Sequence, residues 1–348
     1  MKLIRPQAVT TAMLTTTNII EAAPAEWSSI TTYASGAQVG ITSGYTVTLY
    51  QSLAAANTGN SPATSPAWWT AIGTTYAEYD SAAVYGLGDR VINLTDHHVY
   101  ESAQAANTGH ALTDAAWWID AGATNRWAMF DTTNGTTTAH PSSIDVTLAM
   151  SSRIDGIALL NVSASTVQVI LTDATDGVVY NQTQSLTSTT GIDDWYSYLF
   201  DEVVRRRDVT FYDLPPYGSL TVQIIIDGGG SAVECGTCIL GLVRQIGGTS
   251  YGAGVGINDY SRKETDVFGN YSITERAFSK RGDFRVTIEN TDLDEIVRIL
   301  AAYRATPIVY DGTGIYGSTL VFGFYKNFSV EIAYPTKSFC TLEVEGLT

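Results

Sequence analysis

The residues best suited to contact a ligand are aromatic, and they occur in two copies. Tyr50 and the pair Trp68-Trp69 return as Tyr100 and the pair Trp117-Trp118, each with an Asn-Thr-Gly turn between them. Exposed aromatic rings offer flat apolar faces on which the C–H faces of sugar rings can pack, while polar neighbours fix the orientation of the sugar. The duplicated set therefore predicts contact with a polysaccharide. The residues that carry this prediction are Tyr100, Glu101, Asn107, Trp117 and Trp118 in the second copy, and Tyr50, Gln51, Asn57, Trp68 and Trp69 in the first.

These copies belong to a repeat of roughly fifty residues. Matching positions are 52 residues apart at the first tyrosine, 50 at the second and 49 at the tryptophans. A unit this short has few aliphatic residues and must use aromatic rings in its own core. Adjacent side chains of an extended chain point to opposite faces, so we expect one ring of each Trp-Trp pair to be buried and the other to be exposed. A purely structural role stays open for any single ring.

The order of motifs in the second copy carries a family resemblance. Tyr85-Gly-Leu-Gly-Asp-Arg-Val91 is followed by Tyr100-Glu-Ser, Asn107-Thr-Gly and Trp117-Trp118. This order resembles the small chitin- and cellulose-type carbohydrate-binding modules. In that family binding rests on a few exposed aromatics, which the resemblance places at Tyr100, Trp117 and Trp118, with Tyr50, Trp68 and Trp69 as the weaker set. The first copy departs from the pattern, because Gly36-Ala-Gln-Val39 replaces the Gly-Asp-x-Val signal.

Composition predicts a mainly β protein. Of the 348 residues, 45% are hydrophobic and only 16% are charged, and the many Thr, Ser, Val, Tyr and Gly residues favour strands and turns. The net charge of −16 argues against nucleic acid or an anionic membrane as a partner, because both attract clustered Lys and Arg residues. This length allows about two to four domains.

Targeting signals and cysteines give further expectations. Pro6 interrupts the first residues before any apolar run of signal-peptide length, and no run reaches the roughly eighteen apolar residues of a membrane span. We therefore expect the chain to be made in a cytoplasm. Cys235 and Cys238 have the spacing of half a zinc site, but Cys340 stands alone and cannot supply the other half. We expect structural cysteines, with neither a metal nor another cofactor.

Five segments are predicted: an N-terminal segment (1–25), two repeats (26–74 and 75–123), a β-sandwich of jelly-roll type (124–246) and a C-terminal β-rich domain (247–348). In the sandwich, short runs of strand-forming residues alternate with turn residues. Its start, Asn125-Arg126-Trp127, and its strand pattern resemble the galactose-binding-like jelly rolls, which often bind glycans or a structural calcium ion. The predicted strands are 143–150, 156–161, 167–172, 178–182, 209–213, 219–227 and 238–245.

The C-terminal domain is predicted to hold one helix among strands. Thr291 can cap this helix, apolar residues recur at helical spacing from Leu293 to Leu300, and Arg304 lies near its end. The glycine-rich segment 252–256 is predicted to be a flexible connection, and Arg281-Gly-Asp283 a tight hairpin turn. The predicted strands are 265–267, 271–277, 284–288, 307–311, 318–325, 329–334 and 339–345.

Three segments near the C-terminus carry a second resemblance. They are Thr306-Pro-Ile-Val-Tyr-Asp-Gly312, Phe322-Gly-Phe-Tyr-Lys-Asn-Phe-Ser329 and Cys340-Thr-Leu-Glu-Val-Glu-Gly-Leu-Thr348. They resemble the carboxyl-terminal segments of tailed-bacteriophage tail-tip and baseplate proteins, including minor tail proteins. The resemblance implies a structural virion protein that serves in host attachment. Its implied partners are other tail proteins (hub, tail tube or fibre proteins), host-cell polysaccharide and further copies of the chain, as a trimer or hexamer.

Alternative functions remain beside this one. Carbohydrate-binding modules often accompany glycosidases, which need two carboxylates about 5 to 10 Å apart. Asp193, Asp194, Asp201 and Glu202 are candidates, yet acidic clusters beside aromatics are ordinary in an acidic β protein, so we expect no catalysis. The chain could also be an accessory glycan-binding protein or a bacterial surface adhesin. In a packed tail tip, the same tryptophan rings could instead grip a neighbouring protein.

Overall fold

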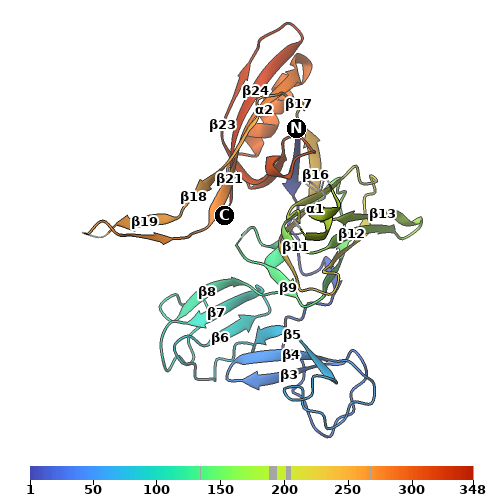
Figure 1. Cartoon of the computed structure of the whole chain (residues 1–348), viewed down its shortest axis with the longest axis vertical. Coiled ribbons are helices and arrows are strands. Elements are labelled where there is room, and N and C mark those ends of the chain that lie inside the picture. Colours follow the sequence, from blue (N-terminus) through green and yellow to red (C-terminus); the bar gives the residue numbers. More distant parts are fainter. Residues whose placement is uncertain (134, 188–193, 201–204, 266–267, 348) are drawn as a thin grey trace.

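In the computed structural model the chain is built almost wholly of β-strands (Figure 1). The structure describes residues 1–133, 135–187, 194–200, 205–265 and 268–347. Within these ranges the strands form one long sheet, a five-stranded sheet, two three-stranded sheets and a two-stranded ribbon. The mainly β class predicted from the sequence is confirmed. None of the described helices is long and apolar enough to cross a membrane.

A β-sandwich forms the middle of the molecule. Its side chains alternate between faces, so that Ile144, Val146, Leu148 and Met150 of one strand all enter the same core. That core lies between the five-stranded sheet and one end of the long sheet. The five-stranded sheet has the order β13 (Gly177–Ser185), β12 (Thr166–Asp173), β15 (Leu220–Asp227), β10 (Ser143–Met150) and β2 (Leu14–Thr17).

The long sheet runs from the sandwich into the C-terminal part of the chain (Figure 1). Two short strands pair outside its main path: β9 (Thr138–His140) with β16, and β18 (Gly254–Asp259) with β21. The main order is β14 (Val209–Tyr212), β11 (Gly156–Ser163), β16 (Val233–Gln245), β1 (Lys2–Pro6), β22 (Ile308–Asp311), β23 (Leu320–Glu331), β24 (Lys337–Gly346), β21 (Phe278–Glu289) and β17 (Gly248–Thr249).

Strand β1 joins the two halves of this sheet. It pairs with β16 of the sandwich along one edge and with β22 along the other. Leu3 and Ile4 are fully buried, and they enter different apolar clusters on opposite faces of the sheet. Strands β1 and β2, both within the N-terminal segment predicted at residues 1–25, therefore pair with strands that lie more than a hundred residues away in sequence.

Helix α2 (Leu293–Ala302) lies in the C-terminal part, where one helix was predicted. It buries Ile296 and Leu300 against the sheet. Two details of the prediction are wrong: the N-cap is Asp292 without a side-chain cap bond, and the predicted strands 318–325 and 329–334 form the single strand β23. Among the described residues, the other helical elements are α1 (Trp195–Phe200) and three 3-10 turns, η1 (Ala128–Phe130), η2 (Asn290–Asp292) and η3 (Gly317–Thr319).

A long hairpin projects from the C-terminal part; we call residues 254–283 the arm (Figure 1). At its root β18 pairs with β21, and farther out β19 (Arg262–Thr265) pairs with β20 (Tyr271–Thr274) as an isolated ribbon. Two predictions are wrong here. Part of the segment 252–256 belongs to β18, and Arg281-Gly-Asp283 continues β21 without a turn, because both segments pair with each other in the ladder.

The two repeats form two small modules, inserted between β2 and β9 (Figure 1). Each module is a three-stranded antiparallel sheet with its own apolar cluster. The strands of the first module are β3 (Gln38–Ser43), β4 (Thr46–Ser52) and β5 (Trp69–Tyr76), and those of the second are β6 (Arg90–Asn93), β7 (His98–Ser102) and β8 (Trp118–Ala123).

Candidate glycan-binding site

Each module is stabilised by a buried asparagine at the equivalent position, Asn57 in the first module and Asn107 in the second. Asn57 exchanges backbone hydrogen bonds with Tyr33 at 2.9 and 3.1 Å, and Asn107 does so with Tyr85 at 2.9 and 3.0 Å. The side-chain amide of Asn107 donates to Ser102 Oγ at 3.1 Å and to the carbonyl oxygen of Trp117 at 3.3 Å, and Asn57 makes the equivalent pair of contacts. Both asparagines are fully buried. In each module the asparagine therefore connects the loop before the tryptophans to the sheet.

One tryptophan of each pair belongs to the core, as predicted. Trp69 is 2% exposed and Trp118 is 3% exposed. Trp118 packs edge-on against Tyr85 with ring centroids 5.1 Å apart, and its indole N–H donates to the carbonyl oxygen of His110 at 3.0 Å. The prediction that Trp69, Trp118, Asn57 and Asn107 contact a glycan is corrected, because their burial leaves no surface for a ligand.

The other predicted residues reach the surface. Trp68, Trp117, Tyr50 and Tyr100 are all partly exposed. Tyr100 and Trp117 both pack against the apolar cluster of the second module, so the structure brings them to the same core. Tyr100 also donates to Asp96 Oδ2 at 2.8 Å. Burial, together with this carboxylate, raises the pKa of Tyr100 to about 12.

The polar residues predicted to orient a sugar have other partners. Glu101 lies on the opposite face of β7 from Tyr100, and it accepts a hydrogen bond from Arg90 Nε at 2.8 Å. Gln51 donates weakly to the carbonyl oxygen of Gly36 at 3.4 Å. Glu101 and Tyr100 therefore do not converge on one ligand position.

A histidine that the sequence analysis did not select covers the outer tryptophan of the second module. The His110 ring lies parallel to the Trp117 ring, with centroids 3.8 Å apart and an interplanar angle of 10°. The first module has Asn60 at the corresponding place, 50 residues earlier. The exchange of Asn60 for His110 is visible when the two repeats are compared. A single histidine does not indicate a functional role, however, until the residue that it contacts in space is known.

A buried carboxylate positions the pair of modules. Glu21 is 4% exposed and lies where the chain leaves the sandwich for the first module. It accepts hydrogen bonds from Thr124 Oγ1 at 2.9 Å and Trp127 Nε1 at 3.3 Å, and it pairs with His97 Nδ1 at 2.9 Å. The His97 ring also stacks on Trp127 at 4.2 Å. This network fixes both modules to the sandwich, and it has no local sequence signature.

The modules also contact each other directly. Tyr45 of the first module donates to the carbonyl oxygen of Val84 at 2.8 Å, and its ring lies 4.6 Å from that of Tyr85. The two modules therefore present their surfaces in a defined relative orientation.

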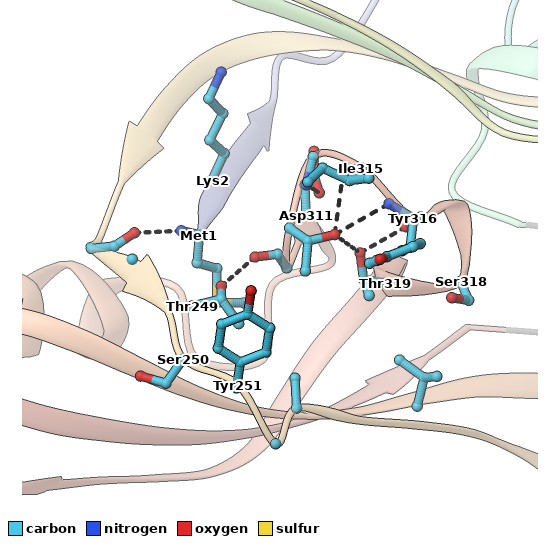
Figure 2. A pocket seen from close by; sticks show the side chains of 18 of the residues that line it. Met1, Lys2, Thr249, Ser250, Tyr251, Asp311, Ile315, Tyr316, Ser318 and Thr319 are labelled. Carbon is cyan, nitrogen blue, oxygen red and sulfur yellow. Dashed lines mark hydrogen bonds between the residues drawn. The ribbon is translucent and has the colours of Figure 1, made fainter.

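A groove of about 710 Å³ lies at the root of the arm (Figure 2). Its rim carries Tyr251, Ile315 and Tyr316, all strongly exposed. Asp311 lies at its buried side and accepts hydrogen bonds from Tyr212 Oη and from the backbone N–H of Gly314, each at 2.7 Å. Burial and this carboxylate raise the pKa of Tyr212. The exposed rings around this groove suit it to contact with another apolar surface.

The three cysteines lie in the apolar clusters of the sandwich and of the C-terminal part. Cys235, Cys238 and Cys340 are buried and unpaired, and burial raises the pKa of Cys235 to about 12. Within the ranges that the structure describes, no cluster of three His, Cys, Asp or Glu side chains could hold a metal ion. Asp193, Asp201 and Glu202 lie outside the described residues.

Comparisons of this chain with protein-family models, with curated proteins and with solved structures found no match.

Proposed function

We propose that this chain is a structural protein of a bacteriophage tail tip or baseplate. In this proposal it assembles with other tail proteins and with copies of itself through its C-terminal part. It presents the two modules to polysaccharide on the host surface, so that it acts in the virion and carries no catalytic activity. The resemblances at residues 85–118 and in the last quarter of the chain support this assignment.

The assembly role rests on the arm, whose outer ribbon has no buried residues. Every residue of β19 and β20 is exposed. The exposed side chains include Phe268 at 86%, Tyr271 at 67% and Ile273 at 63%. An isolated two-stranded hairpin is marginally stable in water, and exposed apolar patches mark interaction sites. The arm therefore has the properties of a segment that packs on a partner protein.

The separation of the arm from the modules supports a protein that contacts other tail proteins at one place and the host surface at another. The modules and the arm project from different parts of the molecule (Figure 1). Charge differs between them as well. Residues 26–123 contain eight acidic residues and one basic residue, whereas the arm contains five of each. A neutral arm lets copies of an acidic chain meet with little electrostatic repulsion.

Light scattering across a concentration series tests the assembly role. We expect the 37.4 kDa chain to form a discrete oligomer, such as a trimer or hexamer. The double variant Tyr271→Ser/Ile273→Ser should be monomeric, while the control Thr265→Ser, on the same ribbon, should assemble as wild type does. If the wild-type chain stays monomeric both alone and with the other tail proteins, the assembly role is wrong.

A second candidate is an accessory glycan-binding protein without a tail. The observation that favours it is that each module has its own apolar cluster and an outer, partly exposed tryptophan. Polysaccharide binding by a chain that never associates with tail proteins would select this candidate.

A further inference from the structure

The two modules differ at one position that decides what the outer tryptophan can do. In the first module this position is Asn60, and its side-chain amide donates to Asn57 Oδ1 at 2.9 Å. In the second module it is His110, which lies flat on the ring of Trp117. The two residues are otherwise equivalent, since the backbone carbonyl of each accepts the indole N–H of the buried tryptophan, at 2.9 and 3.0 Å.

This exchange leaves an unpaired acceptor in the second module. Asn107 Oδ1 is buried and has no hydrogen-bond partner among the described residues, whereas the same atom of Asn57 is satisfied. An unsatisfied buried acceptor is unfavourable. His110 therefore does not supply the hydrogen bond that Asn60 supplies in the first module, and its ring stacks on Trp117 instead.

The stacked ring occupies the place that a sugar would need. A sugar ring packs on the flat face of an indole, parallel to it and in van der Waals contact. The His110 ring has this arrangement on Trp117, 3.8 Å away and within 10° of parallel. No aromatic ring stacks on Trp68 in the part of the chain that the structure describes. Among the described residues, both outer tryptophans are partly exposed, and an aromatic ring stacks on the one in the second module alone.

We propose that the first module is the open glycan-binding copy and that His110 closes the second. This inference rests on the proposed glycan-binding function, and it reverses the order of the two copies expected from the family pattern. A glycan then binds at Trp68, and binding at Trp117 requires the His110 ring to leave. His110 acts as a positioning residue, because it controls access to Trp117.

Charge narrows the class of glycan. Residues 26–74 contain Glu26 as their only charged residue, whereas residues 75–123 contain seven acidic residues and Arg90. An anionic polysaccharide gains no attraction from the first module and is repelled by the second. The ligand of the open copy is therefore a neutral polymer, and a flat stacking face suits a β-linked chain.

Exchanging the two residues tests the proposal. The probes are soluble six-sugar chains of β-1,4-linked glucose and of β-1,4-linked N-acetylglucosamine, titrated into the full-length chain by calorimetry. We expect wild type to bind one equivalent of at least one probe. His110→Asn should raise this to two equivalents, and adding Trp117→Ala to that variant should return it to one. Asn60→His should abolish the site of wild type.

Three outcomes are informative. A stoichiometry of one that His110→Asn leaves unchanged overturns the closed state of the second module, provided that the variant melts no lower than wild type. A wild-type stoichiometry of two overturns it as well. If no variant binds either probe or insoluble cellulose and chitin, the glycan-binding function itself fails, which is distinguishable from the first two results.

Discussion

The Glu21 carboxylate accepts a hydrogen bond from Thr124 Oγ1 across 2.9 Å, although 103 residues separate the two in sequence. Glu21 precedes the first module and Thr124 follows the second, so this bond closes the whole insertion at its base. Both side chains are buried. The orientation of the modules relative to the sandwich thus depends on one carboxylate and its donors.

Replacing Glu21 by Ala should loosen this junction. The change leaves the donors of Thr124 and Trp127 buried without an acceptor, and each such group costs about 1–3 kcal/mol. We expect a loss of that order in the free energy of unfolding, measured by denaturant titration. The control is Glu78→Ala, an exposed carboxylate in the second module, which should change stability by less than about 0.5 kcal/mol. Equal effects of the two substitutions would show that the junction does not depend on Glu21.

The paired asparagines should differ in the stability that they supply. Asn57→Ala removes two donated bonds and the bond accepted from Asn60, whereas Asn107→Ala removes only two donated bonds. We expect the first substitution to cost about 1 kcal/mol more than the second. Hydrogen exchange read separately on β4 and β7 provides the measurement. A larger loss of protection in the second module would contradict the hydrogen-bond pattern.

The thiols should be unreactive in the folded chain. Burial raises the pKa of Cys235 to about 12 and that of Cys340 to about 11, from 9.0 in the unfolded chain. The folded chain therefore keeps these protons when the unfolded chain releases them. Their contribution to stability is complete below pH 9 and is lost as the pH rises toward 11 and 12.

A thiol reagent at pH 8 measures this directly. We expect no reaction within the native chain and reaction of all three cysteines in guanidinium chloride. Rapid reaction of Cys235 or Cys238 in the folded chain, or zinc that survives dialysis, would point instead to a redox or metal role.

Gly241 of strand β16 lies against strand β1, and we expect that this position tolerates no side chain. A Cβ atom there would lie 1.8 Å from the carbonyl oxygen of Arg5, on the neighbouring strand. We expect Gly241→Ala to cost about 1–3 kcal/mol of stability, because the backbones must move apart. Gly218→Ala is the matched control, since a Cβ atom there meets nothing within 4 Å. Thermal unfolding compares the two, and a neutral Gly241→Ala would mean that β1 does not lie against β16.

The periodicity of apolar side chains predicted individual strands and the helix correctly. Strand β10 has the bounds expected from its alternation, Ser143–Met150, and helix α2 lies where its apolar spacing placed it. The repeat was also visible, because duplication preserves residue order. In these elements the period of the side chains, together with turn residues, is sufficient.

Long-range pairing could not be predicted in the same way. Strand β1 is five residues long, and its partners lie more than two hundred residues away. The junction at Glu21 and the stacking of His110 on Trp117 likewise depend on which residues meet in space. The arm was missed because its glycine-rich start resembles a linker until β21 is known to pair with it. Periodicity within a segment carries no information on such partners.

The central claim is that this chain is part of a phage tail and faces the host through its modules. The most direct measurement is electron microscopy of the virions that carry it, labelled with a gold-conjugated antibody raised against residues 26–123. We predict label at the distal end of the tail in most labelled particles. Virions that bind no label after gentle purification, or label confined to the capsid, would contradict the claim.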